Sequence, residues 1–351
     1  MKKTLNKTKI ADFATYIGVV IAFIVMNALM NEGLLTRSMK GQLVPICCYI
    51  VMAVSLNLTV GILGELSLGH AGFMSVGAFT GVVTAMSLQS AIPSDGVRLA
   101  LAIVMGAIFA GIAGTLVGIP VLRLHGDYLA IVTLAFGEII KELINCLIIG
   151  HDENGLHIIF NATGAKTVTD LGLTETGKVL IKGAQGATGT DTIASFTAGF
   201  ILIMVTLVVV LNLARSRSGR AIMALRDNRI AAESVGINVT KYKLMAFVTS
   251  AALAGGAGAL YGLNFSNLVS SKFDFNTSIL ILVFVVLGGL GNMWGSIIAA
   301  AVLTVLPEAL RGFADYRMLI YAIVLIVVML ATNSPQMKAL LSKLAPFGKT
   351  V

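Results

Sequence analysis

Long apolar runs separated by polar connections extend along most of the 351-residue chain. A helix of about 20 residues crosses the hydrocarbon core of a bilayer, and about ten runs approach that length, with eight or nine as the lower count. The runs cover residues 13–31, 43–63, 66–90, 97–119, 127–149, 194–213, 244–264, 277–291, 294–310 and 316–333. This pattern predicts an all-α, polytopic transmembrane helix bundle that forms a single domain over residues 1–351.

The composition agrees with a membrane location. Hydrophobic residues make up 57% of the chain, charged residues make up 12%, and the mean hydropathy is +0.92. A soluble domain carries about 25% charged residues, so this chain lacks the charges that a water-exposed surface needs. The net charge of +8 does not indicate a nucleic-acid partner, because the basic residues lie in loops, where they set topology. The three cysteines lie within apolar runs and match no metal-site spacing, so no metal is expected.

The distribution of lysine and arginine predicts the orientation of the chain. Ten crossings place both termini on one side of the membrane, and 15 of the 25 basic residues lie on that side. Seven of these are in the loop 214–243. Basic loops stay on the cytoplasmic side, so we expect cytoplasmic termini, a cytoplasmic loop at 214–243 and an extracytoplasmic loop at 150–193.

The loop 214–243 has the composition of a short, capped helix. Asp227 or Asn228 is suited to cap its N-terminus, and Gly236 to end it in a left-handed conformation. Ile230, Ala231, Ala232 and Val235 supply two turns of small apolar surface between these caps. Two interpretations remain open from the residues alone. The helix either inserts into a cleft of another protein and transmits ATP-driven motion, or it lies among the lipid headgroups with its arginines on anionic lipid.

Four polar residues within the apolar runs are candidates for a translocation pathway. Glu65, Ser67 and His70 lie in a glycine-rich stretch, and polar groups at membrane depth need protein or a water-filled cavity around them. Glu65 alternatively lies at the cytoplasmic mouth, and His70 alternatively is a packed, hydrogen-bonded side chain. Glu138 lies about 16 Å along its helix at 1.5 Å per residue, near the middle of the bilayer. Its alternative is an internal ion pair with Lys141.

Small residues recur at four-residue spacing in two of the apolar runs. Such residues let transmembrane helices approach closely, so we expect helix packing rather than ligand binding here. The glycines concerned are Gly106, Gly114, Gly118, Gly258 and Gly262.

A set of motifs occurs in order between about residues 43 and 335. The motifs are Gly64-Glu-Leu-Ser-Leu-Gly-His-Ala-Gly-Phe, Leu122-Arg-Leu-His-Gly-Asp-Tyr-Leu-Ala-Ile-Val-Thr-Leu-Ala-Phe-Gly-Glu-Ile-Ile, Ser218-Gly-Arg-Ala, Ala231-Ala-Glu-Ser-Val-Gly-Ile-Asn, Lys243-Leu-Met-Ala-Phe-Val-Thr-Ser-Ala, Leu287-Gly-Gly-Leu-Gly and Leu306-Pro-Glu-Ala-Leu-Arg. They resemble the permease family of branched-chain amino-acid ABC importers, and most closely its LivM-type membrane subunit. The chain departs from the family in two places: Glu65 stands where Gln is usual, and the loop 150–193 is longer and richer in Gly and Thr.

The resemblance implies the fold and the partners of an ABC importer permease in the bacterial plasma membrane. The expected partners are a sister permease in a heterodimer, two cytoplasmic ATPase subunits and an extracytoplasmic substrate-binding protein. The chain would then be no enzyme and hold no cofactor, because ATP and Mg²⁺ bind the ATPase subunits. The implied cargo is leucine, isoleucine and valine. The counterpart of the ATPase-coupling segment comprises Ala231, Ala232, Glu233 and Gly236.

Three other functions are weighed against this one. The first is an ABC permease of the same superfamily that carries another small solute, such as urea or a sugar, as relatives of the family do. An ion-coupled secondary transporter would need several charges within the membrane, and Glu138 is the clearest one here. An intramembrane enzyme would need a catalytic motif such as His-Glu-x-x-His or Gly-x-Ser-x-Gly, and the sequence has neither.

Overall fold

The computed structural model describes residues 2–33, 36–124, 126–153, 155–161, 168–173, 177–310, 322–323 and 326. The helices of this part of the chain are α1 (Lys2–Asn31), α2 (Arg37–Asn57), α3 (His70–Ser87), α4 (Asp95–Val121), α5 (Asp127–Asn145), α6 (Phe196–Arg215), α7 (Arg217–Asp227), α8 (Arg229–Ser234), α9 (Val239–Gly262), α10 (Phe275–Gly288) and α11 (Met293–Ala309). A π-helical turn, η1 (Leu58–Leu63), continues α2, and three short 3₁₀ turns occur at η2 (Val168–Leu171), η3 (Gly183–Gln185) and η4 (Ser270–Phe273).

The helices follow the predicted apolar runs closely. Each of the first nine runs coincides in the main with one helix, and five helical segments are long and apolar enough to cross a membrane. The chain is therefore a polytopic membrane protein. Several boundaries differ from the prediction: α1 begins at Lys2, α2 at Arg37 and α9 at Val239, each before its predicted run. The run 66–90 becomes helical only at His70, and the helix of the run 127–149 ends at Asn145. The tenth run, 316–333, lies outside the described residues except for 322, 323 and 326.

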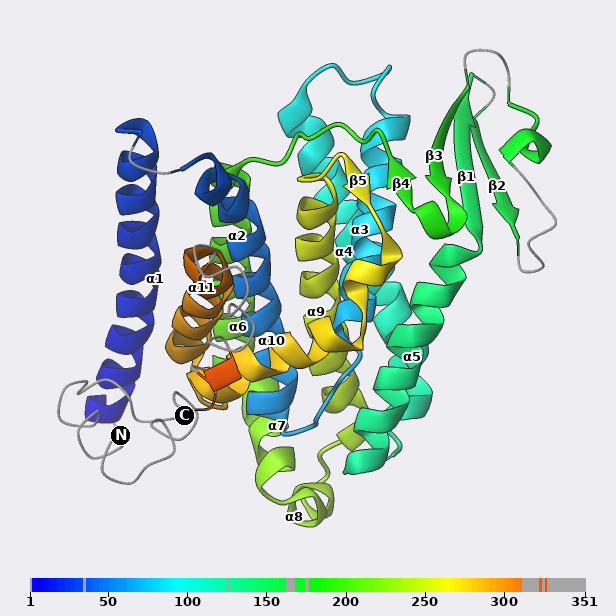
Figure 1. Ribbon diagram of the computed structural model, residues 1–351. Helices are drawn as coiled ribbons and strands as arrows, with labels where there is room; N and C mark the ends of the chain where they lie inside the picture. The colour runs from blue at the N-terminus through cyan, green and yellow to red at the C-terminus, as the bar shows by residue number, and fades with distance from the viewer. Residues whose placement is uncertain are drawn as a thin grey trace.

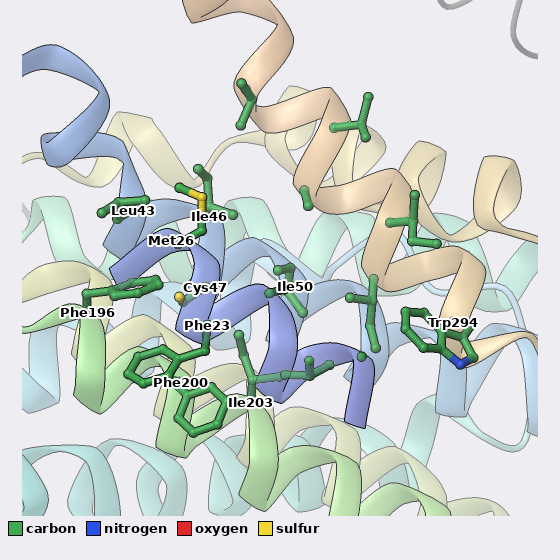
Figure 2. Close-up of a pocket in the computed structure, with 18 residues that line it drawn as sticks. Phe23, Met26, Leu43, Ile46, Cys47, Ile50, Phe196, Phe200, Ile203 and Trp294 are labelled. Atoms are coloured by element: carbon green, nitrogen blue, oxygen red, sulfur yellow. The ribbon is translucent and has the colours of Figure 1, made fainter. Parts of the chain in front are cut away.

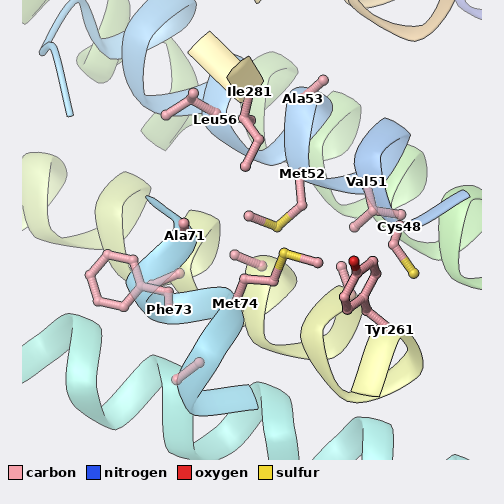
Figure 3. Close-up of a cluster of buried hydrophobic side chains, with 14 of the residues drawn as sticks. Cys48, Val51, Met52, Ala53, Leu56, Ala71, Phe73, Met74, Tyr261 and Ile281 are labelled. Carbon is pink, nitrogen blue, oxygen red and sulfur yellow. The ribbon is translucent and has the colours of Figure 1, made fainter. Parts of the chain in front are cut away.

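Helix α2 lies at the centre of the bundle and α1 at its edge. In the most apolar window of each, 89% of the α2 residues are buried but only 11% of the α1 residues. Side chains of α2, α3, α9 and α10 meet in the main core, where Met52 and Met74 lie side by side (Figure 3). Phe73 of α3 packs edge-on against Phe247 of α9, with ring centroids 5.5 Å apart.

Helices α3, α4 and α9 approach one another through their small residues. A Cβ atom on Gly258 would lie 2.0 Å from the carbonyl oxygen of Met74, and one on Gly114 would lie 2.6 Å from Cβ of Ala251. An added Cβ would lie 2.8–3.0 Å from its nearest neighbour at Gly106, Gly118 and Gly262. All five glycines singled out in the sequence thus lie at close helix–helix contacts.

The opposite end of the molecule from α8 carries an antiparallel sheet (Figure 1). Its order is β2-β1-β3-β4-β5, with β1 (Leu147–Asp152), β2 (Gly155–Phe160), β3 (Lys178–Lys182), β4 (Ala187–Thr188) and β5 (Asn267–Leu268). The prediction of an all-α fold is wrong here, and four of the five strands lie wholly or partly within the predicted loop 150–193.

The sheet has a clear physical origin in the sequence. Two six-residue segments rich in isoleucine, β1 and β2, flank a turn that contains Gly155 at φ +123°. Branched side chains fit a pleated strand, and glycine accepts this turn conformation. The short strand β5 lies between α9 and α10, so the sheet ties the end of α5 to the α9–α10 connection.

Candidate functional site

The predicted helix of loop 214–243 forms two helices, α7 and α8. Asn228 begins α8, because its side-chain oxygen accepts a hydrogen bond from the N–H of Ala231 at 3.0 Å. Gly236 follows α8 at φ +84°, a conformation that favours glycine. Asp227 is not the cap: it is the last residue of α7, and its carboxylate lies 3.4 Å from Nε of Arg226.

The apolar residues predicted for this helix divide between its two sides, because Ala232 is buried and Ile230, Ala231 and Val235 are exposed. Ala232 is buried and packs with Leu225 and Val239 in a small cluster beneath the helix. Ile230 and Val235 instead point away from the protein, with 80% and 75% of their surface exposed. Both residues belong to the apolar surface that the sequence predicted for this helix, together with Ala231 and Ala232.

The other two residues assigned to coupling lie on the exposed side of α8. Ala231 is exposed, and so is Glu233, whose carboxylate lies 3.4 Å from Nε of Arg229 one turn earlier. Such an exposed pair contributes little to stability. Neither residue belongs to the cluster beneath the helix.

The turn η1 contacts α7 and α9, the helices on either side of α8. Residue Asn57, just before η1, is fully buried and bridges to the α10–α11 connection. Its side chain accepts a hydrogen bond from Gly291 N–H at 2.8 Å and donates one to Oγ of Ser296 at 2.9 Å. The sequence reasoning did not include Asn57, although an amide within an apolar run is itself a signal of such a bridge.

Glu65 follows η1 and forms an ion pair with Lys243 of α9. Only 15% of the Glu65 side chain and 5% of the Lys243 side chain are exposed. A second cation reaches the same stretch, because the Arg226 guanidinium donates to the carbonyl oxygen of Gly61 at 2.8 Å. Glu65 therefore lies near the end of the bundle that carries α7 and α8, as one of its two interpretations proposed.

Ser67 and His70 continue the stretch toward the interior. Both are buried, and Oγ of Ser67 has no hydrogen-bond partner among the described residues. The Ser55 hydroxyl donates to the carbonyl of Met52 at 3.0 Å and lies 2.9 Å from Nε2 of His70. His70 is thus a packed, hydrogen-bonded side chain in this conformation, while Ser67 keeps an unused polar group.

Glu138 lies on α5, directly after Gly137, where an added Cβ would lie 3.4 Å from Cα of Gly69. Its carboxylate pairs with Lys141 one turn later, and 36% of its side chain is exposed. This is the internal pair that was the alternative to a pathway role. The structure therefore brings Glu65, Ser67 and His70 together on one segment, and Glu138 lies on α5, the helix that packs against this segment at Gly69.

Comparison with known proteins identifies the family. The chain matches the family described as "Branched-chain amino acid transport system / permease component" over residues 38–330. The chain belongs to this family. As a permease component it is a membrane transport subunit and not itself an enzyme.

The chain is similar to several named permease proteins. The high-affinity branched-chain amino acid transport system permease protein LivM of Escherichia coli (strain K12) is 34% identical over 292 residues, which are 80% of this chain and 66% of that protein. The chain thus spans slightly less than two thirds of the LivM length. The LivH permease protein of Salmonella typhimurium is 22% identical, over 80% of this chain and 88% of that protein. The ribose import permease protein RbsC of Haemophilus influenzae is 32% identical, over 33% of this chain and 38% of that protein. No solved structure matches the permease.

An apolar pocket of about 340 Å³ lies between α1, α2, α6 and α11 of the permease (Figure 2). Phe23, Phe200 and Trp294 point into it from three of these helices. Among the residues that the structure describes, the lining includes no charged side chain. An amino acid carries an ammonium and a carboxylate that need polar partners, so this pocket is not suited to hold one.

Proposed function

We propose that this chain is the permease subunit of an ATP-driven ABC importer that moves leucine, isoleucine and valine into the cell. Membership of the family supports the proposal, and so does the identity to LivM over most of the chain. The observation that carries it is α8, a short capped helix that presents Ile230 and Val235 outside the bundle.

The partners follow from this proposal. The chain resembles both LivM and LivH proteins, which supports a pair of permeases in one importer. The ATPase subunits would contact this chain at α7 and α8. ATP and Mg²⁺ would be held by the ATPase subunits rather than by this chain. A substrate-binding protein would deliver the amino acid at the other end.

The arrangement of the elements supports one orientation in the bacterial plasma membrane. The first turn of α1 lies at the same end of the molecule as α7 and α8, opposite the sheet (Figure 1). Seven basic residues lie in the loop 214–243 at that end. The positive-inside rule then makes this end cytoplasmic and the sheet extracytoplasmic, where a binding protein would dock. Ten spans would return the C-terminus to the cytoplasm.

In the proposed mechanism the membrane helices do no covalent chemistry. ATP binding closes the ATPase dimer, the two coupling helices move with it, and the pathway between the permeases changes the side to which it opens. The segment with Glu65, Ser67 and His70 is a candidate for the cytoplasmic part of that pathway.

Uptake by the reconstituted importer tests the function. The chain, its sister permease and both ATPases are placed in proteoliposomes with the binding protein and radiolabelled leucine. We expect uptake that requires ATP, stops with vanadate and persists with a protonophore while ATP is held constant. Uptake that a protonophore abolishes at constant ATP would instead indicate a secondary transporter. A binding protein that prefers a sugar or urea would correct the substrate but keep the class.

The role of α8 is tested separately. Ile230→Asp places a charge on the exposed apolar pair, and we expect at least about tenfold less ATPase to copurify with the permease, a typical effect at an interface anchor. Thr240→Asp, on the exposed first turn of α9, is the matched control and should retain the ATPase. Equal retention in both variants would remove α8 from the interface.

A further inference from the structure

Helix α8 is attached to the bundle at both of its flanks, and both attachments reach the same short stretch of chain. On one flank, Arg226 of α7 donates to the carbonyl oxygen of Gly61 at 2.8 Å. On the other flank, Lys243 of α9 pairs with Glu65. The stretch Gly61–Glu65 therefore receives a polar contact from each side of α8.

This stretch is a change in backbone conformation rather than a continuous helix. The π-helical turn η1 ends at Gly64, which has φ +81°, and the chain then runs without helix to His70. Single π-helical turns within α-helices occur frequently at functional sites. The stem of Arg226 covers Gly64 closely, since a Cβ there would lie 2.6 Å from its Cγ.

The interior side of the stretch is held in place. Gly61 packs against the α10–α11 connection, where a Cβ on Gly61 would lie 2.3 Å from the backbone nitrogen of Gly291. Asn57 binds the same connection. Beyond Gly64, by contrast, the hydroxyl of buried Ser67 has no partner among the described residues. The stretch is thus held on both sides of Gly64, since the N–H of Leu68 donates a hydrogen bond to Oγ1 of Thr133 on α5 at 3.0 Å, while Ser67 keeps an unused hydroxyl.

We propose that Arg226 and Lys243 are positioning residues that transmit a displacement of α8 to Gly61–Glu65, with Gly64 as the hinge about which residues 65–69 move. The proposal rests on the proposed role of α8 in coupling. It assigns the transmission of motion to the contacts of Arg226 and Lys243. It can therefore be wrong even where α8 does bind the ATPase. A purely structural function of the same contacts would affect folding but would not change the amount of substrate moved per ATP.

The ion pair is tested by exchanging its charges in the complete importer. Glu65→Lys and Lys243→Glu each bring two like charges together, and the double variant restores an opposite pair. We expect each single variant to hydrolyse ATP but to move at least about tenfold less leucine per ATP, within the usual range of coupling energies. The double variant should recover to within about threefold of wild type. A double variant no better than the singles, or singles with unchanged stoichiometry, would overturn the assignment of Lys243.

The Arg226 contact is tested with a matched pair on α7. Arg226→Met keeps the stem over Gly64 and removes the donor to Gly61, while Arg217→Met removes an exposed arginine from the same helix. We expect the first to lower leucine moved per ATP by about tenfold and the second to leave it unchanged. Equal stoichiometry in the two variants would overturn the assignment of Arg226.

A labelling experiment on the permease decides the link without reference to ATP. In a Cys146→Ser background, Leu66→Cys places a thiol on the segment beyond the hinge, and Cys47 and Cys48 remain buried. We expect Arg226→Met to change the labelling rate at position 66 by about fivefold or more and Arg217→Met to leave it alone. If wild-type uptake proves independent of ATP, the proposed function fails while this labelling still tests the link. An unchanged labelling rate at position 66 in Arg226→Met would overturn the proposed link between Arg226 and the segment beyond Gly64.

Discussion

The layer of α3, α4 and α9 and the face around α1 are both built from apolar helices, yet they pack in opposite ways. In the layer, glycines bring backbone against backbone, as at Gly258 and Met74. Around α1, aromatic rings fill part of the space and leave a pocket of about 340 Å³. Phe23 stacks on Phe200 there with ring centroids 4.1 Å apart.

This difference separates a rigid part of the permease from a part that lipid can accommodate. Close-packed interiors leave little freedom, so the α3–α4–α9 layer should move as a unit. The α1 face is apolar and mostly exposed in the isolated chain, so acyl chains replace protein contacts there at little cost. Three further experiments test the comparison, from the largest expected effect to the smallest.

Truncation of one phenylalanine in each region should give the largest contrast. Phe284→Ala removes a ring that is 1% exposed in the core, and we expect the free energy of unfolding to fall by about 4 kcal/mol. Phe23→Ala should cost about 1 kcal/mol, because lipid can enter the space that the ring leaves. Unfolding of both variants in the same bilayer mimic measures the difference. Equal losses would show that α1 packs as tightly as the core.

An added methyl group should distinguish backbone contacts from looser ones. Gly258→Ala places a Cβ 2.0 Å from a carbonyl oxygen that cannot turn away, and we expect a loss of about 3 kcal/mol in unfolding free energy. Gly111→Ala lies on α4, where the nearest atom would be 3.5 Å away. That control should change the unfolding free energy by less than about 1 kcal/mol, because the better helix propensity of alanine offsets the small strain. A tolerated Gly258→Ala would mean that α3 and α9 separate readily.

Removal of the Ser67 hydroxyl should have the smallest effect on stability. Its oxygen is buried and has no partner among the described residues, so Ser67→Ala removes an unsatisfied group and should change the unfolding free energy by less than about 0.5 kcal/mol. A fall in leucine uptake at unchanged stability would place Ser67 on the pathway. Ser55→Ala, which removes a partner of His70, is the contrasting variant and should destabilise the fold. A destabilised Ser67→Ala would show instead that the hydroxyl has a structural role.

The sequence predicts the helices well because their signal is strong and local. Long apolar runs have one stable form in a bilayer, and Asn228 and Gly236 mark the ends of α8 by their own chemistry. The sheet was missed because the glycine- and threonine-rich residues that follow β2 have the composition of a loop. Strand β5 could not be predicted locally, since its pairing joins Ala187 to Leu268 across a large sequence separation.

The candidate site was predicted by residue type more than by arrangement. A charged or hydroxyl residue in an apolar run indicates a protected position, which is true of Glu65, Ser67 and His70. The sequence does not reveal which partner protects it. Lys243 and Arg226 come from distant parts of the chain, and the inward direction of Ala232 depends on the packing of α7 beneath α8.

The peripheral position of α1 has a consequence for biosynthesis. Its side chains contact Phe196 and Phe200 of α6 and Trp294 of α11, which leave the ribosome long after α1 does. At 5–20 residues per second, α1 waits on the order of tens of seconds for Trp294 to be made. During that interval it must remain in the membrane by its own hydropathy of 2.2, without help from the helices it will later touch. Its apolar character therefore serves the nascent chain before it serves the finished bundle.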